Sequence, residues 1–126
     1  MVRKMDIEKV IDALRTLRVG TTIAEFDLQN KIATALYVAE IPYDREHLLG
    51  KGSRVDFLAG GVAIEVKKGK PNRAKLVTQI DRYAAYDDVV AVVIVVETSL
   101  FIPIKETSNG KPCAVVGLQK LWGIAL

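Results

Sequence analysis

Two short segments of alternating polar and apolar residues, joined by Gly60 and Gly61, constrain the fold of this chain more than any other feature. The segments are RVDFLA (54–59) and VAIEVK (62–67). Paired glycines favour a two-residue hairpin turn because both central residues adopt a positive φ. Side chains of a hairpin alternate between its faces, and here one face is wholly apolar, which predicts that it packs on the core. This face carries Val55, Phe57, Ala59, Val62, Ile64 and Val66.

The other face of the hairpin brings like charges together. The two-residue turn places Asp56 opposite Glu65 and Arg54 opposite Lys67, and directly opposed like charges are unfavourable. Two carboxylates about 5 Å apart repel by roughly 3 kcal/mol at an effective dielectric constant of about 20. On a solvated face, diagonal pairs of Asp56 with Lys67 and of Glu65 with Arg54 would relieve this repulsion.

A shared divalent cation is the alternative that gives the two carboxylates a chemical role. Mg²⁺ prefers carboxylate oxygens and retains several waters, so Asp56 and Glu65 with one backbone carbonyl, that of Val66, would suffice. Lys67 follows Glu65 by two residues and lies on the same face of the strand. Its ammonium would then face a metal-bound water, where it would stabilise a hydroxide or the charge that develops on a phosphate.

The composition is that of a single globular domain, residues 1–126, with a full hydrophobic core. The longest apolar run, Val89 to Val96, is too short to cross a bilayer. The amphipathic N-terminus does not resemble a signal peptide, so we expect a cytoplasmic protein that does not enter the membrane. One cysteine, Cys113, and one histidine, His47, exclude an internal disulfide and a zinc cluster.

Helical and β-type patterns follow one another along the chain and predict an α/β fold. We expect helices at 23–39 and 73–87, an edge strand within 41–50, the hairpin strands at 54–59 and 62–67, and a buried strand at 89–96. The order helix, strand, strand, strand, helix, strand (αβββαβ) forms a core of about residues 22–96. A peripheral helix at 2–17 precedes this core, and residues 97–126, with one further hairpin, form a C-terminal appendage.

Three polar residues fall on the apolar faces of the expected helices. Glu25 continues the stripe of Leu28, Ile32 and Leu36, which aims its carboxylate at the sheet and favours a metal-binding role. Alternatively, Glu25 is the capping-box partner of Thr22. Gln79 and Tyr83 lie four residues apart and share one face of their helix, where amphipathic boundary positions are the alternative interpretation.

Basic residues cluster directly after the hairpin. The net charge of the chain is +3, and five cations fall close together: Lys67, Lys68, Lys70, Arg73 and Lys75. Such a cluster can neutralise the phosphates of a nucleic acid. A solvated basic loop is the alternative.

Asp56, followed by Glu65-Val66-Lys67 on the next strand within an αβββαβ order, resembles the PD-(D/E)XK nuclease superfamily over about residues 22–96. Val55 stands where the motif name has proline, a departure that removes no ligand. The resemblance implies a mixed central β-sheet flanked by helices (the restriction-endonuclease-like fold) and phosphodiester hydrolysis that depends on Mg²⁺ or Mn²⁺. It also implies Asp56 and Glu65 as metal ligands and Lys67 as the residue that assists the attacking water.

Two further matches concern the flanking helices. Glu25 matches a glutamate that many superfamily members carry on the helix before the sheet. QIDRY, which contains Gln79 and Tyr83, is similar to the glutamine and tyrosine motif of the RecB-like exonuclease branch. These matches imply that Glu25 contributes to the metal site and that Gln79 and Tyr83 belong to the catalytic site.

The function that the resemblance implies is cleavage of DNA. We expect it to be directed by structure or by ends, because a chain this short has little room for a base-reading module. Lys68, Lys70, Arg73 and Lys75 would hold the backbone near the site, and Arg54 would contact a phosphate.

Two other functions are compatible with the same residues. A Holliday-junction-resolvase-like endonuclease would act as a homodimer, since it cuts two strands symmetrically. A non-catalytic nucleic-acid-binding or assembly domain would keep the fold without the activity. For a RecB-like domain, the resemblance also implies a helicase or another DNA-processing protein as partner.

Overall fold

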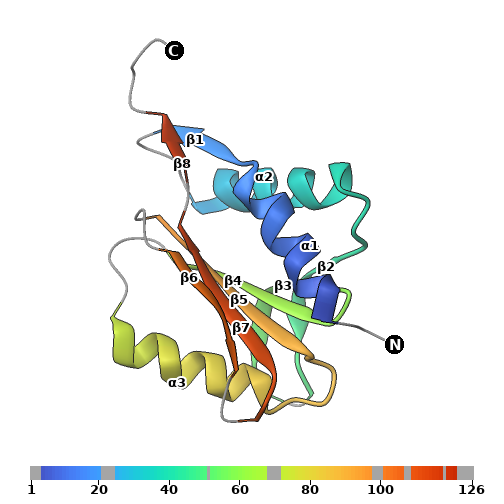
Figure 1. Cartoon of the computed structure of the whole chain (residues 1–126). Helices are drawn as coiled ribbons and strands as arrows, with labels where there is room; N and C mark the ends of the chain where they lie inside the picture. The colour runs from blue at the N-terminus through green and yellow to red at the C-terminus, as the bar shows by residue number, and fades with distance from the viewer. Residues whose placement is uncertain are drawn as a thin grey trace.

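The computed structural model describes residues 4–20, 25–50, 52–67, 72–97, 101–106, 109–117 and 119–121. In this part of the chain, a mixed sheet lies between two helices on one face and one helix on the other (Figure 1). The helices are α1 (Lys4–Arg15), α2 (Glu25–Val38) and α3 (Arg73–Ala84). The strands are β1 (Arg18–Gly20), β2 (Asp44–Leu48), β3 (Arg54–Ala59), β4 (Val62–Lys67), β5 (Ala91–Val96), β6 (Phe101–Glu106), β7 (Pro112–Gly117) and β8 (Gln119–Leu121).

The central sheet has the strand order β2-β3-β4-β5-β7-β6. The strands β4, β5 and β7 run parallel, whereas the pairs β2/β3, β3/β4 and β6/β7 are antiparallel. Helix α3 provides the crossover that a parallel connection from β4 to β5 requires. The predicted order of elements, now α2-β2-β3-β4-α3-β5, and the α/β class with a mixed sheet flanked by helices are confirmed.

The hairpin turn forms as the sequence predicts. Gly60 and Gly61 have φ angles of 59° and 85°, which are the positive values that the turn needs. The paired residues are Phe57 with Ile64, Leu58 with Ala63 and Ala59 with Val62. Every residue of the predicted apolar face is buried: Val55, Phe57, Ala59, Val62, Ile64 and Val66.

One member of that apolar face lies on the wrong side for a regular strand. Val55 packs in the cluster on the α3 side of the sheet, with Leu49 and Ala63, whereas Phe57 packs on the side of α1 and α2. In a regular strand, residues two apart face the same side. The prediction that Val55 and Phe57 share a face is therefore wrong, because β3 changes phase at Asp56, the residue between them.

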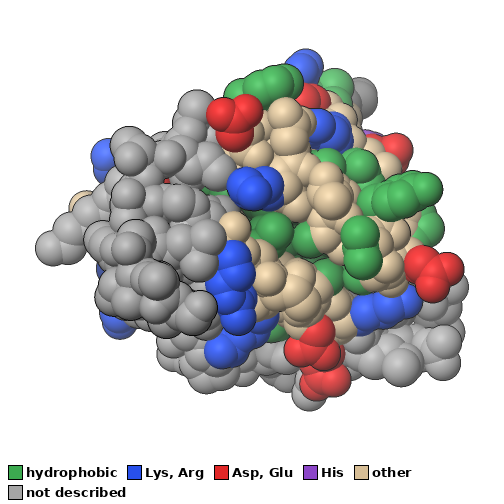
Figure 2. Space-filling view, turned by 90° about the horizontal axis from the view of Figure 1, so that it is seen from above, with side chains coloured by type: hydrophobic (Ala, Val, Ile, Leu, Met, Phe, Trp, Pro, Cys, Tyr) green, Lys and Arg blue, Asp and Glu red, His purple; other side chains and the backbone are tan. Residues whose placement is uncertain are grey.

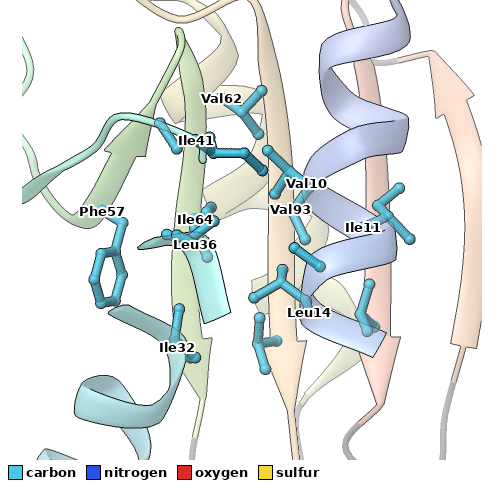
Figure 3. Packing of buried hydrophobic residues seen from close by; sticks show 14 of the residues in the cluster. Val10, Ile11, Leu14, Ile32, Leu36, Ile41, Phe57, Val62, Ile64 and Val93 are labelled. Atoms are coloured by element: carbon cyan, nitrogen blue, oxygen red, sulfur yellow. The ribbon is translucent and has the colours of Figure 1, made fainter. Parts of the chain in front are cut away.

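Helix α1 is not peripheral, contrary to the sequence-based prediction. Val10, Ile11 and Leu14 of this helix are buried, and Figure 3 shows Val10 beside Val93 of β5. Its apolar stripe is buried because the helix packs against β4, β5 and β7 and against α2. The helix therefore contributes to the main core instead of lying over it.

The C-terminal segment is also more central than an appendage. Strand β7 pairs with β5 in parallel and lies between β5 and β6. Every residue of β5 is buried, and a strand that is covered on both faces and both edges must lie inside a sheet. The sequence predicted the hairpin of β6 and β7, but the need of β5 for a second neighbour places it in the sheet.

No helix in the described part of the chain has the length and the apolar character that a membrane span requires.

The central role of α1 can be tested with Leu14→Ala, because the Leu14 side chain is 1% exposed. We expect this substitution to lower the free energy of unfolding by about 2–5 kcal/mol, as for other fully buried leucines. Glu8→Ala, on the exposed side of the same helix, is the matched control and should change it by less than about 0.5 kcal/mol. Urea denaturation followed by circular dichroism measures both, and equal small losses would mean that α1 is peripheral.

Candidate active site

The carboxylates of Asp56 and Glu65 lie where the regular pairing of β3 and β4 ends. Beyond the pair Phe57–Ile64, the backbone N–H of Asp56 donates to Oε1 of Glu65 at 3.1 Å. In return, the backbone N–H of Val66 donates to Oδ2 of Asp56 at 2.8 Å. Each strand thus holds the carboxylate of the other through its backbone, and both acids are fixed in place.

Strand β2 is irregular at the same level. Arg45 and His47 pair with Phe57 and Val55, and Glu46 between them has a φ of 51°. A positive φ is uncommon for a residue with a Cβ atom. The pairing of β2 with β3 thus keeps its register, but the backbone of β2 is distorted opposite Asp56, the residue at which β3 changes phase.

Helix α3 delivers two side chains to the other oxygen of Glu65. The hydroxyl of Tyr83 donates to Oε2 of Glu65 at 3.1 Å, and Nε2 of Gln79 donates to the same oxygen at 3.3 Å. Nε2 of Gln79 also donates to the Tyr83 hydroxyl at 2.9 Å. Gln79 and Tyr83, which the sequence places on one face of the helix, therefore bind the same oxygen of Glu65.

The position of α3 is fixed by its cap and by its apolar face. Oδ1 of Asn72 accepts the backbone N–H of Lys75 at 3.0 Å, which caps the start of the helix. Leu76, Ile80 and Ala84 are buried against the sheet. This packing directs Gln79 and Tyr83 of α3 toward Glu65 of β4.

Lys67 completes the group from its own strand. Its Nζ lies 3.7 Å from Oε2 of Glu65, and the side chain of Glu65 is only 13% exposed. Glu65 is therefore not part of a solvated face, and the ion pair that the described residues give it is with Lys67, not with Arg54.

The Tyr83 hydroxyl is a strongly held proton donor. Burial raises its pKa to about 12, and the negative charge of Glu65 adds to the rise. Because the hydroxyl stays protonated at neutral pH, Tyr83 donates a hydrogen bond to Glu65 throughout the physiological range.

The remaining predicted site residues that the structure describes lie at or near the starts of α2, β3 and α3. Glu25 is the first residue of α2, and its side chain lies outside the described residues, as do Lys68 and Lys70. Arg54 is exposed at the first position of β3, and Arg73 and Lys75 are exposed in the first turn of α3.

Tyr86 is a further residue near the site that the sequence did not reveal. Its hydroxyl accepts the backbone N–H of Ser53 at 3.2 Å, in the loop that leads into β3. The same ring lies against Gly50 and Gly52, where an added Cβ atom would come within 2.8 Å and 2.6 Å of its atoms. The closely spaced glycines before β3 were the available signal, because they mark a close approach of another group to the backbone.

The donor set at Asp56 and Glu65 fits a hard divalent cation. Within the described residues, no three His, Cys, Asp or Glu side chains form a metal-binding group. Mg²⁺ nevertheless needs only one or two protein carboxylates, because it retains several waters. Two carboxylates held side by side by backbone N–H groups meet that requirement with oxygen ligands alone.

Comparisons of the chain with family models, with curated proteins and with solved structures find no match. The interpretation of the site therefore rests on the geometry of its own residues.

The raised pKa of Tyr83 predicts a loss of stability at high pH. An unfolded tyrosine loses its proton at about pH 10, whereas the folded pKa is about 12. The unfolded state therefore releases its proton first, so this contribution is complete below about pH 10 and disappears as the pH rises towards 12. Denaturation at several pH values, with Tyr83→Phe as the comparison, should show a smaller decline for the variant across that interval. An equal decline in both proteins would contradict the raised pKa.

The contact of Tyr86 with the loop before β3 can be tested at Gly50. Gly50 and Gly110 have φ angles of 49° and 76°, but only Gly50 has the Tyr86 ring against it. Gly110→Ala should lose about 1–2 kcal/mol through the left-handed backbone alone, and Gly50→Ala a further 1–3 kcal/mol or so through overpacking. Thermal or urea unfolding measures the difference. Equal losses would show that the ring does not press on this loop.

Proposed function

We propose that this protein is a metal-dependent nuclease of the PD-(D/E)XK type that hydrolyses the phosphodiester bonds of DNA. One observation carries the proposal. The carboxylates of Asp56 and Glu65 exchange hydrogen bonds with opposing backbones at a break in the sheet, and the Lys67 ammonium lies 3.7 Å from Glu65. The side chain of Glu65 is only 13% exposed and is hydrogen-bonded at both oxygens, which fixes a negative charge where a cation can bind.

The chain's own residues would fix the geometry of the reaction. Glu65 is held at Oε1 by the backbone of Asp56 and at Oε2 by Gln79 and Tyr83. Fixed dipoles of this kind stabilise a transition state without reorganising during the reaction. Gln79 and Tyr83 are therefore positioning residues, since they act through Glu65.

Asp56 and Glu65, with the backbone carbonyl of Val66, are the groups that would hold Mg²⁺ or Mn²⁺. A divalent ion bound there would supply Lewis acidity and lower the pKa of a coordinated water. Lys67 points its ammonium at the same carboxylate, where a cation assists an attacking water and stabilises negative charge on a phosphate.

The surroundings of the site suit a nucleic-acid backbone. Arg73 and Lys75 are exposed on the same helix that carries Gln79 and Tyr83. Cations at this position would hold phosphates without reading the sequence. We therefore propose cleavage directed by DNA structure or by ends, in the cytoplasm.

The proposal is tested by comparing the parent with Lys67→Ala on labelled single-stranded, duplex, flapped and four-way-junction DNA. We expect cleavage with Mg²⁺ or Mn²⁺, none with EDTA, and a kcat in Lys67→Ala that is lower by about 10²-fold or more, the usual effect of losing one electrostatic contact to a transition state. Lys9→Ala, an exposed position on α1, is the matched control and should cleave like the parent.

Four results would change the assignment. Equal cleavage by the parent and Lys67→Ala, or cleavage that survives EDTA, would contradict the proposed site. Paired nicks on the four-way junction alone would identify a resolvase. A parent that binds DNA and does not cut it would favour the non-catalytic domain.

A further inference from the structure

Arg82 is a cation beside the candidate site that the sequence motifs do not include. It belongs to the last turn of α3 and is exposed. Its guanidinium carbon lies 5.4 Å from the centroid of the Tyr83 ring, and the Tyr83 hydroxyl donates to Glu65. Tyr83 therefore lies between the positive charge of Arg82 and the carboxylate of Glu65.

The guanidinium is held in place, and no described residue gives it a carboxylate partner. None of the ion pairs found between described residues includes Arg82. Contact with an aromatic face orients an arginine and leaves its N–H donors available. Because the ring belongs to Tyr83, whose hydroxyl donates to Glu65, the guanidinium lies at the edge of the site.

The spacing of residues along α3 places Arg82 on a line with the site. Lys75, Gln79 and Arg82 are separated by four and three residues, so they lie on one side of the helix. Gln79, in the middle, contacts Glu65. Seven residues of helix span about 10 Å, and one strand of B-DNA covers that distance in about three nucleotides. Exposed cations thus flank the carboxylate site at a spacing that matches a short piece of one strand.

Among the described residues, the side of α1 and α2 does not show such an arrangement. Figure 2 looks onto the side of α1 and α2, where Lys and Arg side chains are interspersed with Asp, Glu and hydrophobic ones. Arg45 in β2 also lies over an aromatic ring, 5.4 Å from the centroid of Phe57, but it donates a hydrogen bond to Asn30. An arginine over a ring is therefore found on both sides, and only Arg82 has the carboxylate site beside it.

We propose that Arg82 forms, with Lys75, a binding site for the phosphates of a single nucleic-acid strand that lies along α3 across the carboxylates. The proposal rests on the proposed function for the identity of the reacting bond, but binding itself requires no cleavage. Arg82 holds a phosphate next to the one that is cut, and Lys75 holds the strand on the other side of Gln79. Because phosphates are contacted instead of bases, the site has no sequence preference.

The test measures binding and cleavage separately. Fluorescence anisotropy of a labelled single-stranded oligonucleotide in EDTA gives the affinity at several salt concentrations for the parent, Arg82→Gln and Arg82→Lys. We expect Arg82→Gln to weaken binding and to reduce the slope of log affinity against log salt by about 0.7, the value for one phosphate contact to a single strand. Arg82→Lys keeps the charge and should retain most of the slope.

Arg45→Gln is the matched control, since it removes the same charge from the same kind of ring contact. It should bind like the parent, and thermal melting should show that each variant is folded. In the cleavage assay Arg82→Gln should raise KM with little change in kcat, because it removes substrate binding only.

The outcomes separate this proposal from the nuclease assignment. If Arg82→Gln loses affinity and slope while the parent does not cut DNA, the binding site stands and the nuclease function fails. If the parent cuts and Arg82→Gln matches Arg45→Gln in affinity, slope and KM, the binding site is overturned. A parent that binds no oligonucleotide overturns it as well.

Discussion

The hydrogen bonds between each carboxylate of the hairpin and the backbone of the opposite strand are the interaction on which the site depends. They replace regular strand pairing at the point where β3 and β4 pass Asp56 and Glu65. A backbone N–H group that leaves the ladder must find another acceptor, and here the acids provide it. The same hydrogen bonds hold two negative charges side by side in fixed positions.

The break in the sheet and the packing of α3 support each other. Because β3 changes phase at Asp56, Val55 turns to the α3 side and joins Leu49 and Ala63 there. This gives α3 an apolar surface on which Leu76, Ile80 and Ala84 pack. The helix is thereby close enough for Gln79 and Tyr83 to reach Glu65. An apolar core under the helix and a polar group at its edge are thus parts of one arrangement.

The face of the sheet that α1 and α2 cover forms the larger part of the hydrophobic core. Helices α1 and α2 bury Leu14, Leu36 and their neighbours against alternate residues of β4, β5 and β7 (Figure 3). This larger core holds β4 and β5 rigidly, and rigid strands keep carboxylates in position better than loops do. The buried residues of α1 and the polar residues around Glu65 lie on different sides of the sheet. Substitutions in α1 should therefore change the stability of the fold, whereas substitutions near Glu65 should change the chemistry proposed for the site.

Local features of the sequence determined the Gly60–Gly61 turn, the register of the hairpin as far as Phe57 and Ile64, and the positions of α2, α3 and β5. Turn chemistry and side-chain periodicity act over a few residues, so they can be read from the chain alone. The sequence also placed Gln79 and Tyr83 on one face of α3. It could not say what that face meets, and only the tertiary structure brings both residues to Glu65. The same holds for the burial of α1, the place of β7 beside β5, the change of phase at Asp56 and the contact of Tyr86 with the loop before β3. Each of these depends on contacts between residues far apart in the chain, and no local pattern records which distant surface a helix or strand will cover.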